Sequence, residues 1–342
     1  MEAIVTETVT ITLDELHDLG INVLEANGFS KAHARSINAS IWACQRDECH
    51  SHGAYRLISC VNTIRAGKIS PDAEPEISDR APGIIRIDAK GAYSLLSFEK
   101  GRPLLVEKAR KNGIAALAIN NCHHFSALWP EVEALTTDGL AAISLTNGMS
   151  TVAPAGGTKP VFGTNPFAFG WPRPNGNPYV FDFATSVVAR GEVELHQRAG
   201  QSIPEDWAID AEGKPTTDPA QALQGALLTF GSYKGSAIST MIELLCGGLI
   251  GDLLSPEARE FDPSGSVTPR GGELVIAFDP ISFLGADAEH HRQRAERIFK
   301  EITDQGARLP SERRYEARAR NLASGTVTIP RKLYEDIRAL LK

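Results

Sequence analysis

The stretch from Glu99 to Asn147 constrains the fold most, because it alternates helical and strand patterns twice. The helical pattern EKGRPLLVEKARKN leads into the apolar run IAALAIN, and the helical pattern WPEVEALTT leads into LAAISLTN. Apolar runs of this length between helical patterns are typical of strands in α/β proteins. The sequence therefore predicts a mixed α/β fold.

Helical patterns occupy both ends of the chain. Thr12 followed by Glu15 has the spacing of a capping box, and Ser30 is suited to cap a second helix. A third helix is expected within YRLISCVNTIRAGKI, and the run RKLYEDIRALLK near the end is expected to pack on the N-terminal helices. Pro71 to Pro82 and the turn-rich residues 201–228 are expected to be surface connections.

Composition excludes several classes of function. The chain has 342 residues, of which 42% are hydrophobic, and a net charge of -7. A negative charge argues against nucleic-acid binding, which requires clustered Lys and Arg. We expect no membrane span, because no run approaches the roughly 18 apolar residues required, and no signal peptide. The five scattered cysteines form no CxxC pair, which favours free thiols in the cytoplasm.

The candidate chemistry lies in QRDECHSHGAYR, residues 45–56. Imidazole exchanges protons near neutral pH, and a guanidinium presents a planar pair of donors that suits a carboxylate. His50, Ser51, His52 and Arg56 together therefore suggest proton transfer on an acid substrate. Two alternatives remain open at this point: a metal site formed by His50 and His52 with His123 and His124, and a surface ion pair at Arg56.

Four further segments carry candidate site residues. NCHHFS, residues 121–126, follows a predicted strand, where α/β proteins commonly bind ligands. The segment APAGGTKPVFGTNPFAFG is rich in turn residues, Asp182 ends another strand and Glu192 follows on a helix-like turn. Lys234 lies between glycines before an apolar helix, where it could meet a phosphate. A Walker loop and the G-x-G-x-x-G fingerprint are both absent from the sequence.

Six ordered segments resemble the malate/L-lactate dehydrogenase-like family, a non-Rossmann family of nicotinamide-dependent oxidoreductases. They are SHGAYRL, NCHHFSALWP, PVFGTNPFAFG, VFDFATSVVARGEV, IPEDWAIDAEGKPTTDP and GSYKGSAISTMIELLCGGLIG. The resemblance implies an α/β NADP-binding domain with a largely antiparallel sheet, residues 76–284, and a helical domain, residues 1–75 and 285–342. It also implies a homodimer.

Within this family, QRDxxHSHG and the carboxylate after Arg190-Gly191 resemble the Δ1-piperideine-2-carboxylate/Δ1-pyrroline-2-carboxylate reductases. These enzymes reduce cyclic imines to L-pipecolate or L-proline with NADPH. Hydroxyacid members usually carry lysine where this chain has Glu192, and the reductases usually carry Asp. An anion suits a cyclic imine, because its nitrogen gains positive character as the hydride arrives.

The resemblance assigns roles to individual residues. His52 would donate the proton, Ser51 and Glu192 would form a relay to it, Arg56 would hold the substrate carboxylate, and His50 and His124 would line the pocket. NADPH, or alternatively NADH, would contact a larger set: His124, Phe125, Ser126, Ala127, Leu128, Thr146, Asn147, Thr164, Asp182, Phe183, Ala184, Tyr233, Lys234, Ser311, Arg313, Arg314 and Ala317. Of these, Arg313 and Arg314 would neutralise the extra phosphate of NADPH.

Two other functions remain open. The first is a 2-hydroxyacid dehydrogenase of the same family, acting on malate, lactate or ureidoglycolate. The second is a non-catalytic protein that binds a metal or another ligand.

Overall fold

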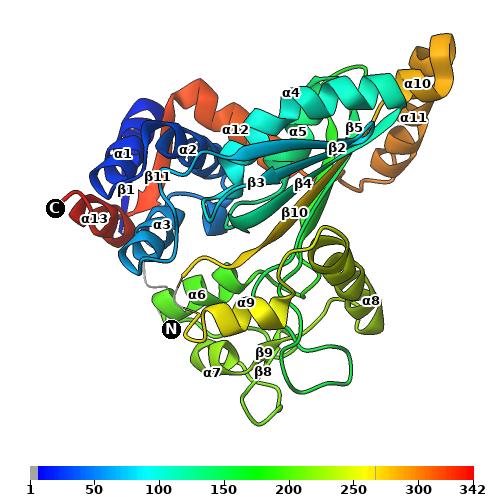
Figure 1. Ribbon diagram of the computed structural model, residues 1–342. Helices are drawn as coiled ribbons and strands as arrows, with labels where there is room; N and C mark the ends of the chain where they lie inside the picture. Colours follow the sequence, from blue (N-terminus) through cyan, green and yellow to red (C-terminus); the bar gives the residue numbers. More distant parts are fainter. Residues whose placement is uncertain (1–6, 266) are drawn as a thin grey trace.

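A seven-stranded sheet forms the centre of the computed structural model, which describes residues 7–265 and 267–342 (Figure 1). Only β3 and β4 pair in parallel, and the other neighbouring strands are antiparallel. The fold is therefore α/β with a largely antiparallel sheet, as the sequence predicted. In spatial order the strands are β2 (Glu76–Ala81), β3 (Ile84–Asp88), β4 (Ile114–His123), β10 (Arg270–Phe278), β5 (Ala141–Thr146), β6 (Phe167–Trp171) and β7 (Tyr179–Phe183).

The predicted alternation forms the middle of this sheet. Helix α4 (Ser94–Asn112) leads into β4, and α5 (Trp129–Thr137) leads into β5. The largest apolar cluster includes Leu105, Leu117 and Val132, which join both helices to the strands. A second cluster on the sheet includes Leu145, Leu274 and residues around the π-helical turn η2 (Glu243–Leu249). The packing of α4 and α5 on the sheet fixes where β4 and β5 end.

The two ends of the chain pack on each other. Strand β1 (Thr8–Thr12) pairs with β11 (Thr326–Pro330), and helix α13 (Arg331–Ala339) contacts α1 (Leu13–Ala26) and α3 (Arg56–Arg65). The capping box at Thr12 and the Ser30 cap of α2 (Lys31–Arg46) are confirmed. The return of the last helix to the N-terminal helices is also confirmed.

The lower part of Figure 1 holds α6 (Arg190–Ala199), α7 (Pro219–Gln224), α8 (Tyr233–Ile242) and α9 (Ser255–Phe261), with the short strands β8 (Ala208–Ile209) and β9 (Ala226–Leu227). Two segments expected to be surface connections contain more structure than the sequence indicated, although residues 71–82 are largely exposed. Residues 71–82 contain β2, and residues 201–228 bury Ile203, Ala208 and Ala222 in a small core. The turn-forming residues of these segments indicated loops. Residues 201–228 are nevertheless partly buried, because a few apolar side chains are enough to form a small core.

Helices α10 (Pro280–Leu284) and α11 (Ala288–Thr303) follow β10 and lie at the upper right of Figure 1. The turn η3 (Gly285–Asp287) joins them. Tyr179 of β7 stacks on Phe299 of α11, and Arg173 pairs with Glu296 at 2.6 Å. This helix therefore contacts the sheet, although the sequence placed it with the terminal helices, and the domain boundaries stay predictions. In the described residues, no helix has the length and apolar content to cross a membrane.

A buried ion-pair network fixes α12 (Glu312–Ser324) to α2 and α5. The fully buried carboxylate of Asp47 accepts from Arg314 at 3.1 Å and from Arg318 at 2.7 Å, and both arginines also pair with Glu133. Burial acts to raise the pKa of Asp47, but hydrogen bonds from Arg318 and Arg46 outweigh it and hold that pKa below its ordinary value. The stability that this network contributes is present above that ordinary value and is lost as the pH falls through the lowered pKa.

We expect Asp47→Asn to lower the free energy of unfolding by about 3–5 kcal/mol, because it leaves buried guanidinium groups without their counter-charge. Urea denaturation at neutral pH measures the change. Glu99→Gln is the control, since Glu99 pairs with Arg35 on the surface, and we expect a loss below about 1 kcal/mol. Equal losses in the two variants would contradict this account.

Candidate active site

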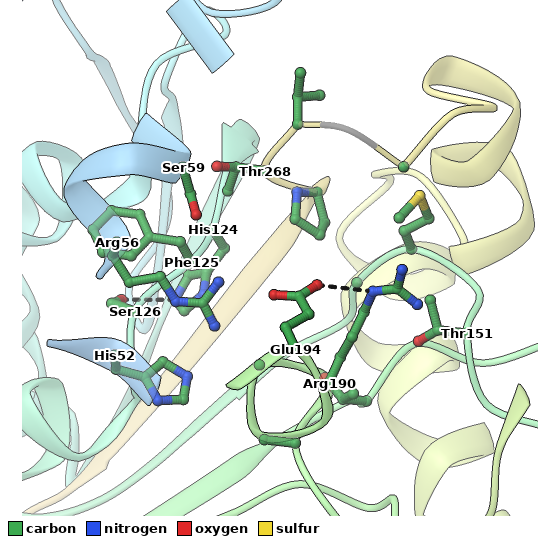
Figure 2. A pocket seen from close by; sticks show the side chains of 18 of the residues that line it. His52, Arg56, Ser59, His124, Phe125, Ser126, Thr151, Arg190, Glu194 and Thr268 are labelled. Atoms are coloured by element: carbon green, nitrogen blue, oxygen red, sulfur yellow. Dashed lines mark hydrogen bonds and ion pairs between the residues drawn. The ribbon is translucent and has the colours of Figure 1, made fainter. Parts of the chain in front are cut away.

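A cavity of about 310 Å³ lies between α3, the ends of β4 and β5, and α6. Figure 2 shows His52, Arg56 and His124 on one side of it, and Arg190 and Glu194 on the other. The sequence predicted the first three as site residues. The structure thus brings together side chains that are separated by up to about 140 positions in the chain.

His52 and Arg56 reach the cavity from consecutive short elements. His52 is the last residue of the 3-10 turn η1 (His50–His52), which lies between α2 and α3, and Arg56 is the first residue of α3. Ser51 Oγ lies 3.1 Å from His52 Nδ1, and Arg56 Nε donates to the carbonyl oxygen of Ser51 at 2.7 Å. These contacts fix the imidazole and the guanidinium in one orientation relative to each other.

Gly191 lets α6 approach Arg56 closely. A β-carbon at this position would lie 2.9 Å from Arg56 Nη2. A larger residue would therefore displace the guanidinium, whereas glycine leaves it in place at the cavity wall. The RG pair in the sequence thus has a steric explanation.

Both cavity histidines are held in their uncharged form. Burial, with help from the charge of Arg56 and from His124, lowers the pKa of His52 to about 3. Burial and Arg56 lower the pKa of His124 to about 4. When the Ser51 hydroxyl donates to Nδ1 of a neutral His52, the ring proton is on Nε2.

The opposite wall contains charged residues that the sequence did not single out. Glu194 accepts a hydrogen bond from Tyr55 Oη at 2.9 Å and pairs with Arg190 Nε at 3.3 Å (Figure 2). Arg198 lies 5.3 Å from the centre of the Tyr55 ring. The i,i+4 spacing of Arg190 and Glu194 was a visible signal of pairing, but only the packing of α6 against α3 shows that the pair faces the cavity.

Glu192, the predicted relay carboxylate, lies on the same helix but does not line the cavity. Its side chain is 43% exposed, and its carboxylate lies 3.9 Å from His196 Nδ1. The structure therefore shows a contact between Ser51 and His52, while the contact it gives for Glu192 is with His196, and the relay stays a prediction. A helix presents different faces at positions 192 and 194.

Several predicted nicotinamide contacts meet at the ends of the strands. His124, Phe125 and Ser126 follow β4 and line the cavity, as do Thr146 at the end of β5, Asn147 directly after it, and Thr164. Asp182 does not line it. Its carboxylate accepts from the backbone N–H groups of Leu128 and Trp129 at 2.7 and 2.9 Å, at the start of α5, and burial raises its pKa to about 6.

The remaining predicted residues lie outside the cavity. His50, Phe183, Tyr233, Lys234 and Arg313 are exposed. Ala184 and Ser311 are partly buried, and Ala127, Leu128 and Ala317 are buried. The structure therefore does not place these residues against the space that His52 and Arg56 line.

Arg314 requires a correction. All three of its guanidinium nitrogens have partners: Nη1 donates to Asp47, Nη2 to Glu133 and Nε to Ser311. The guanidinium is also buried over the Trp129 ring, 3.9 Å from its centre. It is therefore a structural group and does not fit a phosphate contact, because it is buried and already paired with two carboxylates.

Cys49 and Cys122 do not fit the role of a nucleophile. Burial raises the pKa of Cys49 to about 11, and it raises the pKa of Cys122 well above the ordinary value. The thiolate is the nucleophilic form of cysteine. Both thiols are therefore protonated at neutral pH.

Comparison with known proteins defines the family. The model of the malate/L-lactate dehydrogenase family matches residues 11–338, which is nearly the whole chain. The chain belongs to the malate/L-lactate dehydrogenase family. This match confirms the resemblance that the six segments indicated. The absence of a G-x-G-x-x-G motif therefore does not argue against membership of this family.

Relatives within the malate/L-lactate dehydrogenase family narrow the similarity. The chain is 56% identical over 334 residues to the Δ1-pyrroline-2-carboxylate/Δ1-piperideine-2-carboxylate reductase of Pseudomonas aeruginosa, covering 98% of this chain and 100% of that one. It is 58% identical over 336 residues to the Δ1-pyrroline-2-carboxylate reductase of Pseudomonas fluorescens, covering 98% and 100%.

A solved structure agrees with these relatives. The Δ1-piperideine-2-carboxylate reductase of Pseudomonas syringae pv. tomato superposes with a TM-score of 0.91 at 39% identity, covering 97% of this chain and 99% of that one. The chain is therefore an oxidoreductase of the malate/L-lactate dehydrogenase family, and this family membership implies a nicotinamide cofactor.

Proposed function

We propose that this protein reduces Δ1-pyrroline-2-carboxylate or Δ1-piperideine-2-carboxylate to L-proline or L-pipecolate with NADPH. The observation that carries the proposal is that Arg56 and His52 line one cavity and are joined through Ser51. A carboxylate-binding group thus lies beside a proton-exchanging group. The names of the relatives in Pseudomonas support the same substrates.

Arg56 binds the substrate carboxylate in this proposal. Its Nε is occupied by the Ser51 carbonyl, and Nη2 lies against Gly191 at the cavity wall. The free N–H groups can form charge-assisted hydrogen bonds to a carboxylate. Arg56 therefore orients the ring so that the carbon–nitrogen double bond lies near His52.

His52 supplies the proton that completes the reduction. NADPH, when bound, supplies a hydride to the imine carbon. His52 donates its proton to the imine nitrogen, which becomes positively charged, and as the hydride reaches the carbon the π electron pair of the C=N bond becomes the lone pair of a secondary amine. Because the charge of Arg56 contributes to the low pKa of His52, neutralisation of that charge by the substrate carboxylate raises this pKa and favours a protonated donor.

The cavity has features that fit a nicotinamide. Asn147 lines it, and Asn147 Oδ1 is buried without a hydrogen-bond partner among the described residues. A carboxamide N–H group could satisfy this acceptor. We propose that Thr146, Asn147 and Thr164 hold the nicotinamide end, and that exposed Lys234 and Arg313 contact its phosphates.

The direct test is a coupled assay of both imines with NADPH and NADH. We expect oxidation of NADPH by at least one imine, and slower turnover with NADH. Lack of turnover on both imines would remove the proposal. Turnover of malate, lactate or ureidoglycolate instead would favour the hydroxyacid alternative. If neither NADPH nor NADH raised the melting temperature of the protein, a non-catalytic protein would be favoured.

We expect Glu194→Gln to lower kcat/KM by roughly 10-fold to 100-fold, or about 1.4–2.7 kcal/mol. Glu194 is the carboxylate that lines the cavity opposite His52, so its charge is the one that stabilises a positively charged imine nitrogen. Steady-state kinetics on the imine measure the change.

Glu192→Gln is the matched control, because it makes the same substitution on the same helix outside the cavity. We expect a smaller loss than in Glu194→Gln. A larger loss in Glu192→Gln would return the role to Glu192 and the relay that the sequence suggested.

We also propose that the chain forms a homodimer in the cytoplasm. Three large apolar side chains of α8 and η2 are exposed: Met241, Leu244 and Leu249. Exposed apolar surface of this kind favours association, and the five free cysteines fit a reducing compartment. Sedimentation equilibrium of the purified protein measures the oligomeric state.

A further inference from the structure

Two buried glutamates lie behind the cavity and beside His124. Glu131 is on α5 and is 2% exposed, and Glu273 is on β10 and is fully buried. One ring nitrogen of His124 and one oxygen from each carboxylate all lie within 4.8 Å of one another. Charged residues are rarely buried without a partner, so this cluster requires an explanation.

Few donors face the two carboxylates. Glu273 Oε1 accepts from Ser144 at 3.4 Å, and the Ser94 hydroxyl also interacts with the Glu273 carboxylate. Glu273 Oε2 lies 3.7 Å from His124 Nε2, and Ser126 Oγ lies 3.4 Å from the same nitrogen. Glu131 Oε2 and Glu273 Oε2 have no hydrogen-bond partner among the described residues. An ionised carboxylate in such a site loses its hydration without replacing it. Two neighbouring carboxylates therefore cannot both be ionised there.

A β-bulge places Glu273 in this position. The register between β10 and β4 shifts between Gly271 and Glu273. Gly272 allows η2 to come close, since a β-carbon there would lie 2.6 Å from the carbonyl oxygen of Cys246. A bulge can redirect a side chain next to an active site. Here it directs a carboxylate toward His124.

We propose that Glu131 and Glu273 share one proton, and that Glu273 is a positioning residue that holds His124 with its proton on Nε2. The second part rests on the proposed function. In this tautomer His124 Nδ1 is the hydrogen-bond acceptor. The acceptor then serves the bound imine or nicotinamide, while Glu273 fixes the ring.

The charges around the cluster agree with this assignment. Burial raises the pKa of Glu273 to about 7 and that of Glu131 well above its ordinary value. Burial and Arg56 lower the pKa of His124, so its ring stays uncharged and supplies no positive charge to two ionised carboxylates. Other titratable groups that interact with the cluster are His52 of η1, Asp182 of β7, Arg56 of α3, Cys44 of α2, Cys122 of β4 and Cys246 of η2.

Infrared spectroscopy of the full-length protein tests the shared proton without requiring turnover. At neutral pH we expect a carbonyl stretching band of a protonated carboxylic acid, and we expect the Glu131→Gln, Glu273→Gln double variant to lose it. The double variant keeps shape and removes charge, so it should remain folded, as thermal denaturation will show.

Glu243→Gln is the matched control for the band. Glu243 is also buried, but its carboxylate accepts hydrogen bonds from Asn165 at 2.7 Å, from the backbone N–H of Ser255 at 2.9 Å and from Asn147 at 3.3 Å. We expect this variant to keep the band. Absence of the band in the wild type, its persistence in the double variant, or a stoichiometric divalent cation in elemental analysis would overturn the shared proton.

The pH profile of kcat tests the positioning role. As the pH rises through about 7, Glu273 ionises and places a negative charge beside His124. We expect the wild-type kcat to change in this range, and the Glu273→Gln profile to be flat there. We expect Glu273→Gln to keep kcat within about 5-fold, because its amide oxygen still presents a partial negative charge to Nε2, and Glu273→Leu to lose more than about 10-fold. Superimposable profiles, or equal losses in the two variants, would overturn the positioning role.

Discussion

Replacing His52 with glutamine should lower kcat for imine reduction by roughly 10²- to 10⁴-fold, the usual contribution of a positioned acid or base. Glutamine keeps polarity but cannot deliver a proton to nitrogen. His52 lines the cavity together with Arg56. Ser51 Oγ lies 3.1 Å from His52 Nδ1 and fixes the orientation of the imidazole. KM should change little, because Arg56 still binds the carboxylate. Stopped-flow measurement of NADPH oxidation separates the two quantities.

The control for this variant is His17→Gln, which makes the same substitution at an exposed position of α1. We expect its kcat to equal that of the wild type. Ser51→Ala should have an intermediate effect, because it removes the hydroxyl that orients His52 and leaves the imidazole in place. If His52→Gln kept kcat within a few fold of the wild type, another group would have to donate the proton.

Replacing Arg56 with methionine should lower kcat/KM by roughly 30- to 150-fold, or about 2–3 kcal/mol for a lost charge-assisted hydrogen bond. The loss should appear mainly in KM, because the guanidinium binds the carboxylate before and during the reaction. Arg56→Lys should recover part of it, since lysine keeps the charge but not the planar pair of donors.

A second substrate makes this prediction specific. Δ1-Pyrroline, which lacks the carboxylate, should be a poor substrate for the wild type and should lose little further activity in Arg56→Met. An equal loss on both substrates would show that Arg56 acts on the fold or on His52 and not on the carboxylate. The charge of Arg56 also contributes to the low pKa of His52, so the variant should raise that pKa.

Local sequence signals predicted the elements that depend on local physics. The capping box at Thr12 and Glu15, the Ser30 cap and the two apolar runs that became β4 and β5 all follow from nearest-neighbour chemistry. The insertion of β10 between β4 and β5 was not predictable in this way, because antiparallel pairing joins residues about 130 to 160 positions apart.

The same limit applies to the cavity. Residue type and spacing indicated His52, Arg56 and His124, and these three line it. Glu194 was missed because GEVELH offers two carboxylates, and only the contact between α6 and α3 decides which one faces inward. Glu131 and Glu273 were missed because each reads as the polar residue of an amphipathic element. Arg314 was assigned to a phosphate because its charge is visible in sequence and its burial is not.

The most direct test of the central claim follows the hydride. The reaction is run with NADPH that carries deuterium on the reactive face of the nicotinamide, and the product is analysed by mass spectrometry and NMR. The account predicts one deuterium on the carbon that bears the carboxylate of L-proline or L-pipecolate, with the nitrogen-bound proton coming from solvent through His52. Product without deuterium at that carbon, or no amino acid product at all, would contradict it.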